Sequence, residues 1–252
     1  MSGKMRIALK AVLWCSGYLN SDSRTNGEEK LHKFISNQNP KVCIDVGAHN
    51  GSISNFFLKN SNSLVISFEP APSSFKDLVE QNDSFRERFI AVNEALSNEI
   101  GVADFFYNVD NSELSTLGGQ FSEIPYINQT NKEIIKVNIN TLDNWFLANP
   151  VSMQKIDFIK IDVEGFEYEV IQGALKTIRL FKPNYIQIEN NWHNLIIGGR
   201  SMFEISKLLP QYKLFQILSH GKILVERDAS EPLTNIFQYS NFCFVLEGSL
   251  LP

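Results

Sequence analysis

The sequence has few cysteines, no long apolar run and no excess of positive charge. Its three cysteines, Cys15, Cys43 and Cys243, are odd in number and form no C-x-x-C pair, so neither a disulfide framework nor a paired-thiol site is expected. Two of them stand in apolar runs, as reduced core residues do, which favours a reducing, cytoplasmic setting. No apolar run approaches the roughly 20 residues of a membrane span. The formal net charge of -5 gives no reason to expect a nucleic acid as partner.

The chain also lacks internal repeats, blocks of like charge and a Pro-rich linker. Its 252 residues, 43% of them hydrophobic, are enough for one domain with a large core. We predict an N-terminal helical extension over residues 1–40 and one main domain over residues 41–252. The first expected helix, 4–18, mixes three basic residues with apolar ones, so it either packs on the domain or makes a weak contact with a membrane surface.

The stretch VCIDVGAHNG, residues 42–51, predicts a buried strand that stops at a tight turn. Apolar residues lead into Asp45, and Gly47 and Gly51 then bracket three residues. The following segment, 52–60, carries apolar residues at helical spacing. A strand, a glycine turn and a helix form the first unit of a nucleotide-type binding fold.

The rest of the chain alternates expected strands with expected helices. This alternation predicts a parallel sheet covered on both faces, and a late run of strands without helices between them predicts an antiparallel edge with a hairpin. The fold class is therefore α/β, doubly wound. The polar segment between the fourth and fifth expected strands, 109–133, is expected to be a lid or substrate loop. The expected strands are 64–70, 88–96, 102–108, 134–140, 156–165, 183–192, 212–219, 222–227 and 241–247, and further helices are expected at 73–82, 166–180 and 201–210.

Acidic residues stand where the expected strands end. In a doubly wound sheet, ligands bind outside these carboxyl ends. The acids would repel the pyrophosphate of a dinucleotide, and the G-x-G-x-x-G turn that binds it has histidine in place of the middle glycine. A cationic ligand that carries a ribose fits better, since a carboxylate accepts strong hydrogen bonds from hydroxyls. S-adenosylmethionine has both properties. The strands end in Asp45, Glu69, Asp162 and Glu189, and the third ends near Ala95.

Five motifs follow one another along residues 41–192, namely CIDVGAHNGSIS, ISFEPAP, NEALSN, TLDNW and FIKIDVEGFEYEVIQGA. Together they resemble the FkbM family of S-adenosylmethionine-dependent methyltransferases. The resemblance implies the class I (Rossmann-like) methyltransferase fold, with a mostly parallel sheet of seven strands, the last of them antiparallel. It also implies methylation of hydroxyls on sugars and natural products.

The resemblance assigns roles around the cofactor. Gly47 and Gly51 would form the turn under its methionine part. Asp45 would orient the ammonium group, or would only cap the next helix. Glu69 would bind the ribose hydroxyls, and the small side chain of Ala95 would leave room for the adenine. The expected cofactor contacts are completed by Ala48, His49, Asn50, Pro70 and Asp162.

The acceptor hydroxyl poses a separate chemical problem, because it holds its proton about as tightly as water, whose pKa is roughly 15.7. One interpretation makes His193 or Asp162 the general base. Another makes Asp162, Glu189 and Asn190 the oxygen ligands of Mg²⁺ or another divalent cation that grips the hydroxyl. Both stay open on the sequence. The expected catalytic residues are Asp162, Glu189 and His193, with Glu164 and Asn191 beside them.

Three further glutamates lie in the motif that follows Asp162. Glu164 is either part of the acceptor site or an acid that interacts with the dipole of the next helix. Glu167 and Glu169 are expected on a solvated helix face.

The leading hypothesis is an S-adenosylmethionine-dependent O-methyltransferase that acts on a small-molecule or glycan acceptor. N-methylation on the same fold stays open. A nicotinamide-dependent oxidoreductase is disfavoured by the missing middle glycine. A catalytically silent cofactor-binding domain is disfavoured by the acids at the strand ends.

Overall fold

The computed structural model describes residues 3–17, 19–108, 115–119, 132–149, 155–197, 199–235 and 239–252. Most of the segment 109–133, the expected lid or substrate loop, lies outside these residues. Across the described ranges, no helix is both long and apolar enough to cross a membrane.

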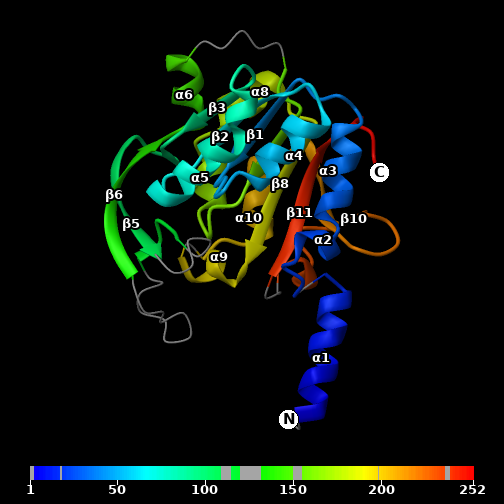
Figure 1. Cartoon of the computed structure of the whole chain (residues 1–252). Helices are drawn as coiled ribbons and strands as arrows, with labels where there is room; N and C mark the ends of the chain where they lie inside the picture. Colours follow the sequence, from blue (N-terminus) through cyan, green and yellow to red (C-terminus); the bar gives the residue numbers. More distant parts are fainter. Residues whose placement is uncertain are drawn as a thin grey trace.

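Helices and strands alternate through most of the chain (Figure 1). The α-helices are α1 (Gly3–Cys15), α2 (Ser23–Asn26), α3 (Glu28–Ser36), α4 (Ser52–Asn60), α5 (Pro72–Asn82), α6 (Leu142–Ala148), α7 (Glu167–Gln172), α8 (Leu175–Phe181), α9 (Trp192–Ile197) and α10 (Met202–Leu208). The strands are β1 (Val42–Val46), β2 (Leu64–Phe68), β3 (Phe89–Val92), β4 (Ala95–Leu96), β5 (Gly101–Asn108), β6 (Lys132–Asn140), β7 (Phe158–Ile161), β8 (Tyr185–Asn191), β9 (Tyr212–Ile217), β10 (Leu224–Glu226) and β11 (Tyr239–Leu246).

The large sheet has eight strands in the order β10-β9-β11-β8-β7-β1-β2-β3. The neighbouring strands β3, β2, β1, β7 and β8 pair in parallel, whereas β11 is antiparallel to both β8 and β9. The expected antiparallel edge is confirmed at β10, which pairs with β9 as a hairpin. This hairpin adds an eighth strand to the seven that were expected. The last strand, β11, lies inside the sheet between β8 and β9, and its residues 240–245 are buried.

A small second sheet, in the order β4-β6-β5, stands beside the large one. The prediction of a single strand over 88–96 is therefore wrong, because the chain leaves the large sheet after β3 and enters the small sheet at β4. The break lies at Asn93, whose side-chain amide donates to the backbone carbonyls of Glu69 at 2.8 Å and Pro70 at 3.2 Å. The turn therefore ties the end of β2 to the start of the second sheet.

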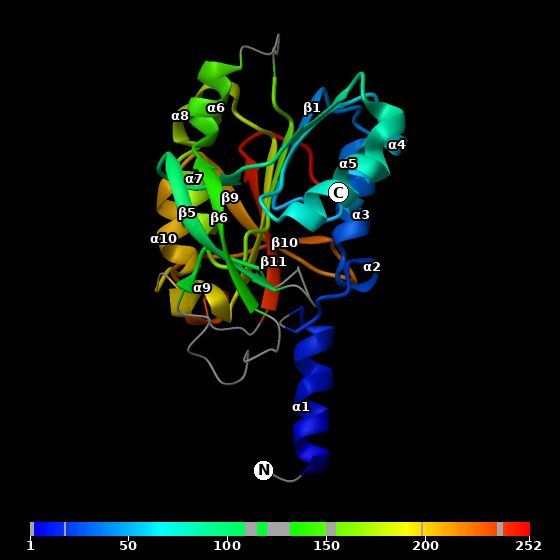
Figure 2. The same cartoon turned by 60° about the vertical axis from the view of Figure 1, so that its left-hand side comes forward.

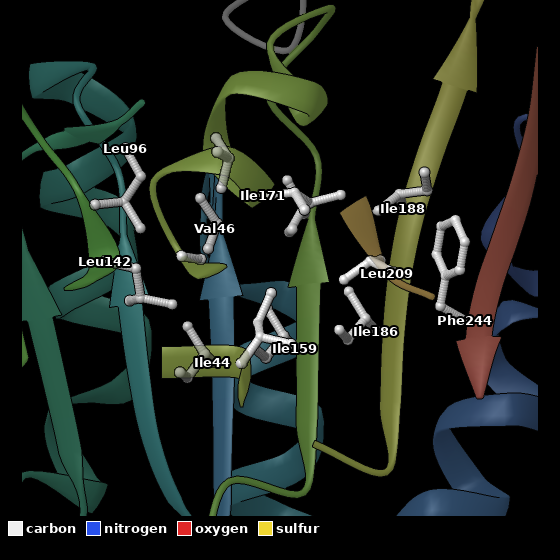
Figure 3. Packing of buried hydrophobic residues seen from close by; sticks show 14 of the residues in the cluster. Ile44, Val46, Leu96, Leu142, Ile159, Ile171, Ile186, Ile188, Leu209 and Phe244 are labelled. Atoms are coloured by element: carbon white, nitrogen blue, oxygen red, sulfur yellow. The ribbon is translucent and has the colours of Figure 1, made fainter. Parts of the chain in front are cut away.

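Helices cover both faces of the large sheet. Helices α3, α4 and α5 lie on one face, and α6, α7, α8 and α10 lie on the other (Figure 2). The core beneath the second group contains Ile44, Ile159 and Ile186 (Figure 3). The core beneath α3 and α4 contains Phe57 and Phe158. Since neighbouring residues of a strand point to opposite faces, strands buried on both sides have continuous apolar sequences.

The predicted extension, 1–40, contains helices α1, α2 and α3, and the boundary at residue 40 stays a prediction. Helix α3 is part of the packed molecule, because Leu31 and Ile35 are buried in the second core. Helix α1 instead extends away from the body, and both views show this (Figures 1 and 2). Five of its large apolar side chains are exposed: Met5, Ile7, Leu9, Val12 and Trp14.

Candidate active site

A cavity of about 810 Å³ opens at the carboxyl ends of β1, β2, β7 and β8. The chain order reverses here, because β2 lies on one side of β1 while β7 and β8 lie on the other. Doubly wound sheets bind their ligands at such a switch point. The segment around α2 and α3 forms a further wall, with Ser23, Glu28 and His32 among its lining residues.

The cavity has two ends, which lie on opposite sides of β1 and β7. The β2 end is lined by Glu69, Pro70 and Ala95, and the β8 end by Asp162, Glu164, Glu189, Asn191 and Tyr239. The turn after β1 lies between them, and its residues 47–50 also line the cavity.

The turn after β1 requires glycine at position 47. Gly47 has a φ of 76°, and a Cβ built there would lie 1.8 Å from the carbonyl oxygen of Asp162. The backbone N–H groups of Gly47 and Ala48 both donate to the carbonyl of Phe68 at 3.0 Å. Gly51, at φ 85°, packs so closely on Leu78 that a side chain there would clash. Gly47 thus brings the ends of β1, β2 and β7 together at one point, while Gly51 lets the start of α4 pack against α5.

His49 and Asn50 shape the turn mainly through their backbones and one cap. His49 has a φ of 49°, a left-handed conformation that non-glycine residues seldom adopt. The Asn50 side chain accepts from the backbone N–H and the hydroxyl of Ser52, at 3.2 and 2.7 Å, and so holds the first turn of α4.

Glu69 follows β2 and is held by two backbone donors. Its Oε2 accepts from the N–H of His49 and its Oε1 from the N–H of Ala71, each at 2.8 Å. Burial raises the pKa of the Glu69 carboxyl to about 7, although both hydrogen bonds act in the opposite direction. Each oxygen keeps a further acceptor position, so this carboxylate can accept hydrogen bonds from two vicinal hydroxyls.

A row of polar side chains crosses the sheet beneath the cavity. Ser67, Asp45, Lys160 and Gln187 are register partners on β2, β1, β7 and β8, and all are at least 96% buried. The hydroxyl of Ser54 donates to Asp45 Oδ2 at 2.6 Å. Burial raises the pKa of Asp45, while the charge of Lys160 opposes that shift. Asp45 thus contacts helix α4 as well as lining the cavity, so both roles expected for it remain compatible with its position.

Lys160 is a buried cation that the sequence analysis did not single out. Its ammonium donates to Asp162 Oδ2 at 2.6 Å. Burial alone would lower the pKa of Lys160, but attraction by Asp162, Glu28 and Asp45 outweighs this and holds it above the ordinary value. Lys160 therefore stays charged and fixes the carboxylate at the end of β7.

Three carboxylates converge at the β8 end. Asp162, Glu164 and Glu189 each place an oxygen within 4.8 Å of the oxygens of the other two. Burial, together with the charges of Asp162 and Glu164, raises the pKa of Glu189 well above its ordinary value. The Asn191 amide donates to Glu189 Oε1 at 2.7 Å and to Glu164 Oε2 at 3.3 Å. Such a group can accept a proton or hold a hard cation.

The structure places the other two expected acceptor-site residues differently. Asn190 is adjacent to Glu189 on β8 and so points to the opposite face, as do Ile186 and Ile188 in the first core. It does not line the cavity with Asp162 and Glu189; Glu164 occupies that position. His193 lies in α9, directly after the site strand, but its side chain is outside the part of the molecule that the structure describes.

Glu167 is not on a solvated helix face, and that expectation is wrong. The side chain is 1% exposed, and Oε1 accepts from the N–H of Val163 at 3.0 Å while Oε2 accepts from that of Gly165 at 3.1 Å. Asn194 of α9 donates to the same carboxylate. Burial raises the pKa of Glu167 to about 8. Glu167 therefore shapes the loop after β7 and ties it to the end of β8.

The N-terminal wall contributes buried polar groups that the sequence analysis also missed. Glu28 accepts from Gln187 Nε2 and from Asn26 Nδ2, each at 2.6 Å. The other end of the Gln187 amide accepts from His32 Nε2 at 2.8 Å. Burial lowers the pKa of His32, which therefore sits here as a neutral Nε2–H tautomer. Lys160 and Gln187 could have been recognised in the sequence, because each is a polar residue inside an apolar strand. No such pattern in the sequence distinguishes Glu28.

The methyltransferase FkbM domain matches residues 45–214. The chain therefore belongs to the FkbM methyltransferase family, and it is an S-adenosylmethionine-dependent methyltransferase with the class I fold.

The chain is similar in sequence to one named bacterial methyltransferase and one named archaeal methyltransferase. The chain is 27% identical over 205 residues to the 2-O-methyltransferase NoeI of Sinorhizobium fredii. This match covers 76% of this chain and 82% of that protein. It is also 27% identical over 175 residues to the hexuronic acid methyltransferase AglP of Haloferax volcanii, covering 69% of this chain and 63% of that protein. Among solved structures, it is similar to an O-methyltransferase from Bacillus cereus in complex with SAH, with a TM-score of 0.44, 11% identity, and coverage of 96% of this chain and 89% of that one.

The described residues fit S-adenosylmethionine. Glu69 offers two acceptor oxygens for a ribose diol, and the turn at Gly47 brings backbone rather than a side chain to the centre of the cavity. The carboxylates around the cavity suit a sulfonium and an ammonium group. Pro70 and Ala95 line the β2 end, as the adenine assignment requires. The roles of individual residues stay predictions.

Proposed function

We propose that this enzyme methylates a hydroxyl of a sugar, in a glycan or in a natural product. The convergence of Asp162, Glu164 and Glu189 at the β8 end carries the proposal, because transfer to a hydroxyl needs a group that removes a proton. The name of the hexuronic acid methyltransferase AglP supports a sugar acceptor, and the name of the 2-O-methyltransferase NoeI supports transfer to oxygen. Membership of the family leaves the particular sugar open.

In this proposal the β2 end holds the cofactor and the β8 end holds the acceptor. S-adenosylmethionine bound at the β2 end would supply an activated methyl group to an acceptor hydroxyl held in line with it, and S-adenosylhomocysteine would be released. Asp162 or Glu189 takes the hydroxyl proton, with Lys160 keeping Asp162 in place. Correct placement of the two reactants supplies much of the rate. His193 stays a candidate base.

Metal assistance is the second version of the same chemistry. Asp162, Glu164 and Glu189 offer the all-oxygen set that Mg²⁺ or a similar ion takes. Asn190 of the originally expected ligand set points to the other face, so Glu164 replaces it in this version. Lys160 already neutralises part of the charge on Asp162, which weakens the need for a dication.

Labelled cofactor tests the proposal. Purified enzyme is incubated with S-adenosylmethionine carrying a labelled methyl group and with glycan, lipid-linked and small-molecule fractions of the source cell. We expect label in a carbohydrate fraction, released by acid hydrolysis as an O-methyl sugar. Label recovered only on nitrogen would support N-methylation instead. Transfer that stops with chelator and returns with Mg²⁺ or Mn²⁺ would support the metal version.

A weak membrane-surface contact through α1 and a cytoplasmic setting belong to the proposal as well. The exposed apolar side chains of α1 stand beside the basic Lys4 and Lys10, and the helix contains no acid. Anionic lipid would suit this combination. Cys43 and Cys243 are buried and free, which is consistent with a reducing compartment. Sedimentation with anionic vesicles, compared between the enzyme and its Ile7→Glu variant, measures the contact.

A further inference from the structure

The acceptor end of the cavity is strongly acidic, and part of that acidity comes from outside the matched FkbM domain. Asp162, Glu164 and Glu189 belong to the domain, whereas Glu28 and Glu29 come from α3, before residue 45. All five line the cavity on the β8 side or on the adjoining N-terminal wall. Their carboxyl groups therefore border the same volume.

Tyr239 shows that these carboxylates converge. Its phenol lies at the start of β11, and burial raises its pKa, with the charges of Glu189, Glu28 and Asp162 adding to the shift. Carboxylates from β8, α3 and the end of β7 therefore all act on the pKa of this one phenol. Glu28 is fixed in this arrangement, because Asn26 and Gln187 each donate to it at 2.6 Å.

The positive charges near this end are already engaged. Among the described residues that line the cavity, Lys160 is the one lysine or arginine, and it donates to Asp162. His32, whose neutral form is favoured by burial, donates to Gln187 and is not one of these charges. Arg24, on α2, does not line the cavity and binds Asp22 through Nε at 2.9 Å. A carboxylate or phosphate on the acceptor would therefore meet a group of carboxyl side chains and, among the described residues that line the cavity, no lysine or arginine other than the engaged Lys160, which costs affinity.

We propose that the acceptor sugar is neutral or carries an amino group, and that this enzyme rejects uronic acids and phosphorylated sugars. The inference rests on the proposed sugar methylation and narrows it to one class of acceptor. The N-terminal segment before the FkbM domain is a determinant of this specificity through Glu28 and Glu29. Glu28 is also part of the buried network that holds Gln187, so Glu29, which is exposed to solvent, is the residue to change.

Methyl glycosides that differ in one group test the proposal. Transfer of labelled methyl from S-adenosylmethionine is measured with the methyl glycosides of glucose, glucosamine and glucuronic acid, and with the corresponding galacto series. We expect kcat/KM for the uronic acid to be at least about tenfold below that of the neutral or amino sugar of the same series. Both Glu29 variants should reduce this ratio of kcat/KM between the two sugars. Glu29→Gln should have the smaller effect, and Glu29→Lys should reduce the ratio by about fivefold.

The exposed Glu80 of α5 provides a matched control, since Glu80→Lys makes the same change of charge away from the cavity. It should leave the ratio between the sugars unchanged. Equal or better turnover of the uronic acid by the unmodified enzyme would overturn the specificity inference while supporting sugar methylation. Intact cofactor binding with no turnover of any sugar would overturn the proposed function, and this inference with it.

Discussion

The two ends of the cavity are built in different ways. The β2 end consists of residues close together in the sequence, with Glu69 fixed by the backbone N–H groups of His49 and Ala71. The β8 end combines side chains from β7, β8, β11 and α3, linked by Lys160 and Gln187. Backbone donors do not depend on side-chain identity, so the first design keeps its geometry while the sequence changes. The second design depends on individual side chains and can change with the acceptor.

The strongest test breaks the point that joins the two ends. Gly47→Ala should lower the free energy of unfolding by at least about 2 kcal/mol and impair both ends, because the new Cβ would meet the Asp162 carbonyl and the φ of 76° disfavours a side chain. Urea unfolding and calorimetric titration with S-adenosylhomocysteine measure the two effects.

Gly221→Ala is the matched control for this change. Gly221 has a φ of 73° but no neighbour within 4 Å of an added Cβ, so this variant reports backbone strain alone, about 1 kcal/mol. Equal losses in the two variants would show that contact with the loop after β7 does not restrict position 47.

The next test affects the β8 end alone. Asp162→Asn should reduce kcat by about 100-fold or more, because it removes a candidate base and the partner of Lys160. Affinity for S-adenosylhomocysteine should change by less than about threefold, since the change leaves Glu69 and the glycine turn intact. Steady-state kinetics and calorimetry separate the two. Near-normal turnover would place the acceptor chemistry on other residues.

A smaller effect is expected at the β2 end. Glu69→Gln removes a charged acceptor of two hydroxyls and should weaken S-adenosylhomocysteine binding by about 1–3 kcal/mol, or about fivefold or more. Glu94→Gln is the comparison, because Glu94 also lines the cavity but accepts from Asn140 at 2.9 Å. Its loss should be smaller. Unchanged affinity in the Glu69 variant would remove this residue from the cofactor site.

The smallest effect follows from the pKa of Glu69, which burial raises to about 7. The folded protein without cofactor favours the protonated form, so this group destabilises the fold as the pH rises from about 4.5 through 7. Ribose hydroxyls favour the ionised form. Affinity for S-adenosylhomocysteine should therefore fall about fivefold to tenfold between pH 8 and pH 6. Titrations of the enzyme and of Glu69→Gln check this, and an equal pH dependence in both would assign the titration to another group.

The accuracy of the sequence-based predictions differed between the two ends as well. The strand, the turn and the acid at 42–51 and 64–70 were predictable, because buried strands and left-handed turns have strong local preferences. At the β8 end, Asp162 and Glu189 were correctly placed at strand ends. Whether Asn190 or Glu164 joins them depends on which face of β8 Asn190 occupies and on the path of the loop after β7, which carries Glu164.

The sequence by itself determined the α/β class, the family and the position of the glycine turn after β1, since these depend on local motifs and on the alternation of strands with helices. Only the tertiary structure decided that β11 lies inside the sheet, that Glu167 is buried and that α3 supplies Glu28 to the cavity. These features depend on contacts between segments far apart in the chain, such as the bond from Gln187 to Glu28. A carboxylate on a helix has the same local sequence signature whether water or a buried amide covers it.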